Sequence, residues 1–174
     1  MHLAGEARPD ASWETLLPDN IHASYNVASV ALRAGCRRLI VASSVHAVYA
    51  SATRPVAADD AVGPANLYGV TKCFAEELAF WCAHRGRMSA AAVRIGAFQT
   101  LEAARRPGAT EWMADTFVAV SDLVSLLELA ITAEYRVVLL DAAAPDRTWL
   151  LDTSTTEELL GWRAQHQFPA GSDR

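Results

Sequence analysis

The side chains with the clearest potential for chemistry are Tyr68 and Lys72, in the segment Tyr-Gly-Val-Thr-Lys. Side chains four positions apart lie on one face of a helix, so the ammonium group of Lys72 is expected beside the phenol of Tyr68. A nearby cation lowers the pKa of a tyrosine from about 10, toward a pH at which the phenol can exchange a proton with a substrate hydroxyl. The alternative is a buried aromatic residue next to a solvated lysine. Because Lys72 is the only lysine and the chain has four tyrosines, chance spacing is the weaker explanation.

Two hydroxyl groups, those of Ser43 and Ser44, end the apolar segment 38–44. Such a short apolar segment is typical of a strand buried on both faces of a parallel sheet. Ligands bind at the carboxyl ends of strands in open α/β sheets, so either serine is a candidate to hold the substrate oxygen that Tyr68 deprotonates. A strand-end turn or a helix cap is the alternative for paired serines. The combination of serine, tyrosine and lysine favours the catalytic interpretation.

Alternating helices and strands must position these residues, which predicts an α/β fold with a parallel sheet. The expected helices span 12–34, 66–85, 121–133 and 154–161, and the expected strands span 38–44, 90–96 and 136–141. Segments 50–64 and 99–116 are expected to be irregular, and Gly35 is expected to end the first helix in a left-handed conformation.

Two further features of these elements bear on packing. The apolar positions of the helix 66–85 recur at helical spacing and predict its core stripe: Val70, Phe74, Leu78 and Trp81. Arg94 lies in the otherwise apolar strand 90–96, where a buried guanidinium group needs a partner. A structural salt bridge is favoured there over a ligand contact.

Composition predicts one domain over residues 1–174, because 52% hydrophobic and 20% charged residues are ordinary globular values. A formal charge of −5 argues against nucleic acid and anionic membranes as partners. The chain has no apolar segment of about 18 residues and no visible export signal, so a cytoplasmic protein is expected. The three cysteines lack metal-site spacing and are expected to be reduced and buried, and no metal site is predicted.

The sequence resembles the extended short-chain dehydrogenase/reductases, also called NAD-dependent epimerase/dehydratases. The resemblance runs along nearly the whole chain and is carried by His2 to Gly5, Asn20 to Asn26, Ser43-Ser44, Tyr68 with Lys72, Val93 to Ala97, Val120 to Leu123, and Leu160 to Trp162. Within the family, residues 43–46, 67–74 and 93–96 look most like the uronate dehydrogenases, which oxidise a hexuronic acid to a lactone. The choice between dehydrogenase, epimerase and dehydratase stays open, since all share the Tyr and Lys chemistry.

The resemblance implies a Rossmann-like sheet, a nicotinamide cofactor (NAD or NADP) and a sugar or uronic acid substrate. It implies that Tyr68 is the base, that Lys72 lowers its pKa and binds the nicotinamide ribose, and that Ser44 or Ser43 holds the substrate oxygen. The cofactor would meet Leu3, Ala4, Gly5, Asn20, Tyr68, Lys72 and Ile95, and the substrate would meet Ser44, His46, Arg105 and Arg106. For His46 the alternative is a histidine satisfied by backbone, and for Arg105 and Arg106 it is a pair of solvated loop residues.

The chain departs from the family pattern because it contains no Gly-rich dinucleotide-binding motif. A Rossmann-like sheet truncated at the N-terminus, without its first βαβαβ half, is therefore expected, and cofactor binding is in question. The exposed edge strand of such a sheet favours self-association, and the family resemblance suggests a homodimer through helices 12–34 and 66–85. Two alternatives stay open: a non-catalytic remnant or subunit that acts by protein interaction, and a split enzyme that needs a separate nucleotide-binding chain.

Overall fold

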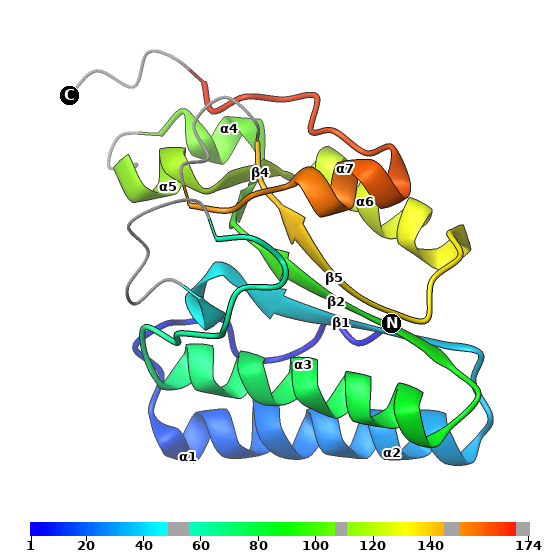
Figure 1. Cartoon of the computed structure of the whole chain (residues 1–174). Coiled ribbons are helices and arrows are strands. Elements are labelled where there is room, and N and C mark those ends of the chain that lie inside the picture. Colours follow the sequence, from blue (N-terminus) through cyan, green and yellow to red (C-terminus); the bar gives the residue numbers. More distant parts are fainter. Residues whose placement is uncertain (49–55, 107–110, 145–149, 170–174) are drawn as a thin grey trace. The chain divides into compact units, whose positions relative to one another are not determined.

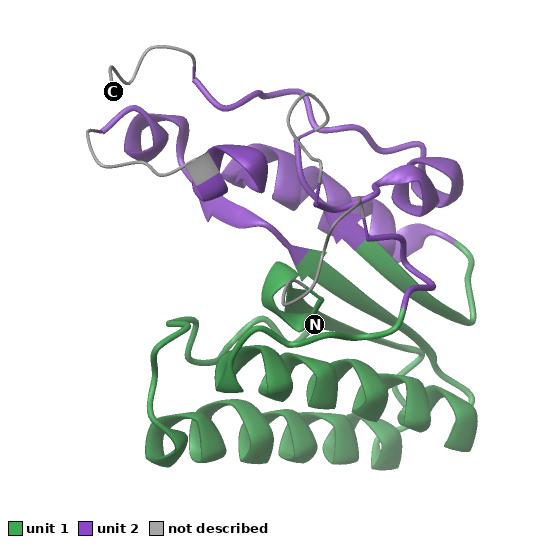
Figure 2. Ribbon diagram, turned by 60° about the vertical axis from the view of Figure 1, so that its left-hand side comes forward, with its two compact units in different colours: residues 1–51, 61–94, 134–140 green, residues 52–60, 95–133, 141–174 purple. Residues whose placement is uncertain are grey.

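The computed structural model describes residues 1–48, 56–106, 111–144 and 150–169. The chain divides into two compact units (Figure 2). Unit 1 comprises residues 1–51, 61–94 and 134–140, and unit 2 comprises residues 52–60, 95–133 and 141–174. Each unit therefore assembles segments that are far apart in the sequence. A single domain over the whole chain remains a prediction.

The main sheet contains β1 (Arg38–Ser44), β2 (Ser89–Ile95) and β5 (Val137–Ala142), in the order β1-β2-β5 (Figure 1). These strands agree with the expected ones to within one residue at each end. Hydrogen bonds join the start of β2 to the residues just before its two neighbours, since the backbone N–H groups of residues 89 and 90 donate to the carbonyl oxygens of residues 37 and 136. Strands whose starts are aligned in this way are parallel, and the predicted α/β fold with a parallel sheet and flanking helices is confirmed.

His2 adds a short fourth segment to the sheet, as a parallel bridge to Val41. Its N–H group donates to the carbonyl oxygen of Ile40 at 2.8 Å, and its own carbonyl oxygen accepts from the N–H group of Ala42 at 3.0 Å. Both backbone groups of His2 thus face β1. Because backbone groups alternate along a strand, those of Leu3 face the opposite side.

The expected helix 12–34 is divided by a π-helical turn. The structure has α1 (Trp13–Leu16), the π-helix η1 (Leu17–His22) and α2 (Ala23–Arg33). A π-turn shifts the helical phase. The apolar positions Tyr25, Ala28 and Leu32 recur at helical spacing beyond it; Tyr25 is exposed, whereas Ala28 is buried and Leu32 is partly buried against the core. The buried polar residues Asn20 and Ser24 share the inner face with Ala28, at a spacing of four. Gly35 follows with a φ of 67°, which confirms the predicted left-handed end.

Helix α3 (Leu67–Arg85) packs on β1 and beside α2, so that these two helices cover one face of the sheet of unit 1 (Figure 1). Its predicted core stripe is wrong for Val70 and Trp81, which are 45% and 52% exposed, whereas Leu78 is partly buried against the core. The buried face is the neighbouring one, formed by Tyr68, Gly69, Thr71, Lys72, Ala75, Glu76, Ala79, Cys82 and Ala83. Small side chains on this face let the helix approach the sheet closely, while Val70 and Trp81 stay exposed.

Unit 2 contains the parallel strands β3 (Ala97–Gln99) and β4 (Phe117–Ala119). Its helices are α4 (Leu101–Ala104), α5 (Glu111–Asp115), α6 (Val120–Thr132) and α7 (Ser154–Leu160). Phe117 is buried and meets the ring of Phe168 edge to face, with 5.5 Å between centroids. The segment 99–116, expected to be irregular, thus contains two short helices, and its residues 107–110 lie outside the described part. Residues 50–55 of the expected loop 50–64 also lie outside the described part.

The cysteines differ from one another in exposure. Cys82 is buried, Cys73 is half-buried and Cys36 is exposed, so the expectation of three buried thiols is wrong for Cys36. Cys36 lies just beyond the left-handed Gly35, where the chain turns from α2 toward β1. No helix in the described ranges has the length and apolar character needed to cross a membrane.

Candidate active site

The start of α3 is fixed against the short 3-10 helix η2 (Val45–Ala47) that follows β1. Asn66 caps α3, because its side-chain oxygen accepts a hydrogen bond from the N–H group of Gly69 at 2.8 Å. A Cβ atom on Gly69 would overlap the carbonyl oxygen of His46 and lie 2.9 Å from its carbonyl carbon. Only glycine therefore allows this approach, which brings the rings of Tyr68 and His46 edge to face at 5.6 Å.

Lys72 lies one helical turn after Tyr68 and is 8% exposed. Its Nζ donates a hydrogen bond to the carbonyl oxygen of Ala42 at 3.1 Å and lies 5.4 Å from the centroid of the Tyr68 ring. Burial lowers the pKa of Lys72 to about 8, because the charged form loses hydration. The structure thus brings together the pair that the sequence spacing predicts.

The pKa of Tyr68 is raised from its ordinary value of 10, chiefly by burial, since the phenolate would lose hydration. A hydrogen bond with Ser44 lowers it, and the charge of Glu6 raises it further. The expectation that the pKa of Tyr68 is lowered is therefore wrong for this chain. Tyr68 keeps its proton at neutral pH.

The two serines at the end of β1 have different partners. Ser44 hydrogen-bonds to Tyr68, and its Oγ accepts from the N–H group of His46 at 3.3 Å. Ser43 donates instead to Oε1 of Glu76 at 2.5 Å. Successive side chains of a strand point to opposite sides, which separates these adjacent hydroxyl groups. Of the two, Ser44 is the one beside Tyr68.

His46 also meets the cap of α3, where Nδ2 of Asn66 donates to Nδ1 of His46 at 3.1 Å. Burial lowers the pKa of His46, so the ring is neutral near pH 7. With Nδ1 accepting, the proton is assigned to Nε2. His46 thus has a side-chain partner, Asn66.

Asn20 lies in the π-turn and holds the turn after the first strand segment. Its Oδ1 accepts from the N–H group of Glu6 at 2.8 Å, and its Nδ2 donates to the carbonyl oxygen of Glu6 at 3.1 Å and to Oγ1 of Thr71 at 2.9 Å. Gly5 has a φ of 151°, and a Cβ atom there would lie 2.8 Å from Asn20 Oδ1. Asn20 therefore joins Gly5 and Glu6 to the face of α3 that carries Lys72.

The remaining residues predicted from the sequence are more exposed. Leu3, Ala4 and Gly5 are exposed in unit 1. Ile95, Arg105 and Arg106 belong to unit 2, where Ile95 is half-buried and both arginines are exposed at the end of α4. Nη2 of Arg106 pairs with Oε1 of Glu102 at 3.3 Å, one turn earlier. Tyr68, Lys72, Ser43, Ser44, His46 and Asn20, in contrast, all belong to unit 1.

Glu76 is the residue that reasoning from the sequence missed. Arg94, for which a salt bridge is predicted, donates from Nε to Oε1 of Glu76 at 3.0 Å and from Nη2 to Oε2 at 3.1 Å. Both side chains are 1% exposed. The spacing in the sequence could have identified Glu76. Tyr68, Lys72 and Glu76 occupy positions i, i+4 and i+8 of one helix, so an acid lies on the same face as the Tyr–Lys pair.

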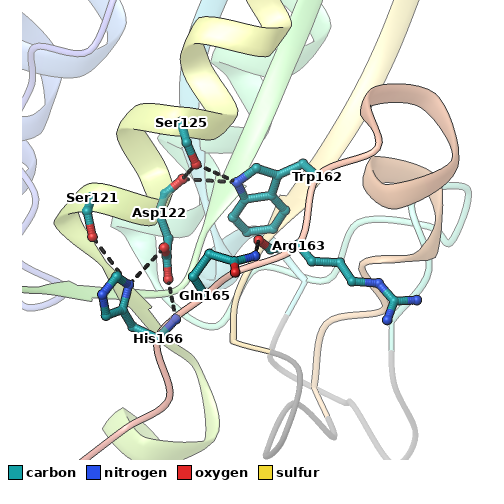
Figure 3. A network of polar contacts seen from close by, with 7 residues as sticks. All are labelled: Ser121, Asp122, Ser125, Trp162, Arg163, Gln165 and His166. Carbon is teal, nitrogen blue, oxygen red and sulfur yellow. Dashed lines mark hydrogen bonds and ion pairs between the residues drawn. The ribbon is translucent and has the colours of Figure 1, made fainter.

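Unit 2 contains a second cluster of polar side chains, drawn in Figure 3. Nδ1 of His166 lies 3.0 Å from Oδ1 of Asp122 and 3.4 Å from Oγ of Ser121. A serine, histidine and aspartate relay needs opposite ring nitrogens for the two partners, and here one nitrogen meets both. Nε1 of Trp162 also donates to the carbonyl oxygen of Asp122 at 3.1 Å. The cluster anchors the C-terminal segment on α6.

The described residues fit the nicotinamide end of a dinucleotide better than its pyrophosphate end. Lys72 has three N–H donors, and Ala42 takes one of them. The turn at Gly5 is exposed and held beside α3 by Asn20. A pyrophosphate needs a Gly-rich turn at a helix N-terminus, and no such motif occurs in the sequence.

For metals, the described residues contain no group of three or more His, Cys, Asp or Glu side chains that could hold an ion.

The parallel sheet with flanking helices defines a class, that of Rossmann-like epimerases and dehydrogenases. The model of the NAD dependent epimerase/dehydratase family matches residues 1–106. The chain belongs to this family.

Three comparisons show which members it is similar to. L-arabinose 1-dehydrogenase (NAD(P)(+)) of Haloferax volcanii is 41% identical over 118 residues, which cover 60% of this chain and 46% of that protein. Uronate dehydrogenase of Agrobacterium fabrum is 32% identical over 166 residues, which cover 94% and 59%. The solved structure of a mutant uronate dehydrogenase from Agrobacterium tumefaciens, complexed with NAD, has a TM-score of 0.79 at 28% identity, covering 94% and 60%. The chain thus spans about half the length of the curated relatives.

Proposed function

We propose that this chain is the catalytic part of an NAD-dependent dehydrogenase that oxidises a hydroxyl group of a sugar or uronic acid. The observation that carries the proposal is the buried pair in which Lys72 Nζ lies 5.4 Å from the ring centroid of Tyr68, with Ser44 hydrogen-bonded to the same tyrosine. The names of the relatives support the substrate class, since they are dehydrogenases of L-arabinose and of uronates. Epimerase and dehydratase chemistry would use the same pair.

Each side chain has a separate task in this reaction. Ser44 holds the substrate oxygen by a hydrogen bond, and Tyr68, in its phenolate form, accepts the hydroxyl proton at Oη. The charge of Lys72 stabilises the phenolate, which burial otherwise disfavours. In the reverse direction the protonated Tyr68 returns the proton to the carbonyl oxygen. NAD or NADP, when bound, supplies the acceptor for the hydride.

Other residues would hold the two ligands. Lys72, Tyr68 and the turn formed by Leu3, Ala4 and Gly5 are proposed to meet the nicotinamide end of the cofactor, together with Ile95, the last residue of β2. His46, whose ring meets that of Tyr68, is proposed to contact the substrate. Arg105 and Arg106 are proposed to bind the carboxylate of a uronic acid, since paired guanidinium groups suit a carboxylate.

The test measures cofactor binding and turnover by the chain as it is. Isothermal titration with NAD and the absorbance of reduced nicotinamide with glucuronate, galacturonate and L-arabinose are compared between wild type and Tyr68→Phe. We expect Tyr68→Phe to lower kcat by roughly 10²–10⁴-fold. Tyr25→Phe is the matched control, because Tyr25 is exposed on α2. A folded wild-type chain that neither binds NAD nor turns over any of these sugars contradicts an autonomous enzyme.

A second candidate is a split enzyme, whose nucleotide-binding part is a separate polypeptide. The backbone side of Leu3 that points away from β1 would form an edge, and an apolar groove of about 440 Å³ lies between α2 and β1. Its lining includes Met1, Val27, Val30, Ala31, Cys36 and Leu39. Such an edge and groove suit the addition of a strand from an apolar partner. A subunit that acts by protein interaction alone would use the same surface.

Restoration of NAD binding separates these candidates. The nucleotide-binding segment of uronate dehydrogenase from Agrobacterium fabrum, added as a separate chain, should restore NAD binding and slow the labelling of Cys36 if the split enzyme is correct. Protection of Cys36 without NAD binding would favour a non-catalytic subunit. In either case we expect a cytoplasmic setting, in which three free cysteines stay reduced.

A further inference from the structure

We propose that Glu76 and Arg94 are positioning residues for the Tyr68 and Lys72 pair: their buried ion pair holds Ser43 and thereby fixes the active face of α3 on the end of β1. The inference rests on the proposed function, since it assigns a role in that same site. Neither residue touches the reacting groups.

Two polar side chains of α3, those of Lys72 and Glu76, form hydrogen bonds with consecutive residues of β1. Lys72 Nζ donates to the carbonyl oxygen of Ala42 at 3.1 Å, and Oε1 of Glu76, one turn further on, accepts from Oγ of Ser43 at 2.5 Å. These contacts fix the helix along the strand and about its own axis. Tyr68, at the same spacing on the same face, is thereby held over the strand end that carries Ser44.

Arg94 makes the buried carboxylate of Glu76 possible. It lies on β2, the neighbour of β1, and binds both carboxylate oxygens, at 3.0 and 3.1 Å. Without this partner the negative charge of Glu76 would lie one helical turn from Lys72 and attract its ammonium group away from Ala42 and Tyr68. The ion pair thus supplies a fixed hydrogen-bond acceptor for Ser43 without a net charge beside Lys72.

Stability alone does not account for the pair. A buried ion pair is often replaced by apolar residues of similar volume with no loss of stability. Among the described residues, Nη1 of Arg94 has no hydrogen-bond partner, so the guanidinium group is not fully satisfied. A group that costs desolvation and leaves a donor unmet is better explained by the orientation that it imposes.

The test uses the fact that Lys72 is the only lysine. In protein labelled with ¹³C-lysine, the Cε signal reports the titration of this single ammonium group, with no cofactor or substrate present. The double variant Glu76→Leu/Arg94→Met replaces the pair with apolar side chains. We expect a folded protein whose Lys72 midpoint rises from about 8 toward the ordinary 10.5, because the loosened helix admits water. The control, Glu157→Gln/Arg163→Gln, removes an exposed ion pair of unit 2 and should leave the Lys72 midpoint unchanged.

Each result of this experiment either supports or overturns the proposal. A folded double variant with an unchanged Lys72 midpoint overturns the proposal and leaves the pair a purely structural one. If the double variant does not fold, Ser43→Ala is decisive, since it keeps the ion pair and removes only its link to β1. A raised Lys72 midpoint in Ser43→Ala supports the proposal, and a wild-type midpoint overturns it. The proposed function can fail independently, by absence of turnover with the Lys72 midpoint still dependent on the pair.

Discussion

The ammonium group of Lys72 donates a hydrogen bond to the carbonyl oxygen of Ala42 at 3.1 Å, so the single lysine of the chain joins α3 to β1. The contact does two things at once. It holds the charge 5.4 Å from the ring of Tyr68, and it keeps the ammonium group in a site where desolvation lowers its pKa to about 8.

Lys72 should make the free energy of unfolding depend on pH. Below about pH 8 the folded and unfolded chains both carry the proton, and the folded chain bears the cost of a buried charge. Between about 8 and 10.5 the unfolded chain binds more protons than the folded one, so stability rises with pH. Relative to Lys72→Met, wild type should gain roughly 3 kcal/mol across this interval. Urea unfolding of both proteins at several pH values measures the difference, and a constant difference contradicts the prediction.

Gly69→Ala should destabilise unit 1, although alanine is normally the better helix former. The added Cβ would overlap the carbonyl oxygen of His46 and separate α3 from η2, at a cost of about 1–3 kcal/mol. Gly63→Ala is the matched control, because a Cβ atom there meets nothing closer than 3.9 Å, at the carbonyl oxygen of Val48. Thermal unfolding followed by circular dichroism compares the two variants. Equal melting temperatures would show that the approach of α3 to η2 is not limiting.

Self-association should depend on the exposed apolar face of α3. Val70 and Trp81 are eleven positions apart, which places them on the same side of the helix, and both are exposed. If this face forms a homodimer, Trp81→Glu should raise the dimer Kd by roughly tenfold or more. Val124→Glu is the control, since Val124 is an equally exposed apolar residue of α6. Sedimentation velocity at micromolar concentration gives the oligomeric state, and a monomeric wild type argues against the homodimer.

Thiol labelling should separate the three cysteines. Cys36 is exposed and should react fully with a maleimide near neutral pH. Cys73 and Cys82 should react slowly, because burial raises the pKa of both thiols, that of Cys73 to about 11, and only the thiolate is nucleophilic. Mass spectrometry should show one rapid addition, which disappears in Cys36→Ser. Two rapid additions would mean that the packing of α3 on β1 opens readily.

Local patterns in the sequence predicted much of the fold. The apolar segment before Ser43 and the Asn66 to Arg85 helix were expected within one residue of their observed bounds, because strand and helix periods are properties of neighbouring residues. The π-turn at Leu17–His22 was not predicted, since a one-residue change of phase leaves little trace in the composition. It is this turn that directs Asn20 inward and Tyr25 outward.

By itself, the sequence determined that a tyrosine and a lysine share one face of a helix near a strand that ends in two serines. Only the tertiary structure decided that Ser44 meets Tyr68, that Ser43 meets Glu76, and that the face with small residues is the buried one. Spacing along a chain gives the relative directions of side chains on one element. Hydrogen-bond partners, burial and the direction of a pKa shift depend on which other elements pack against that face, and these lie tens of residues away in the sequence.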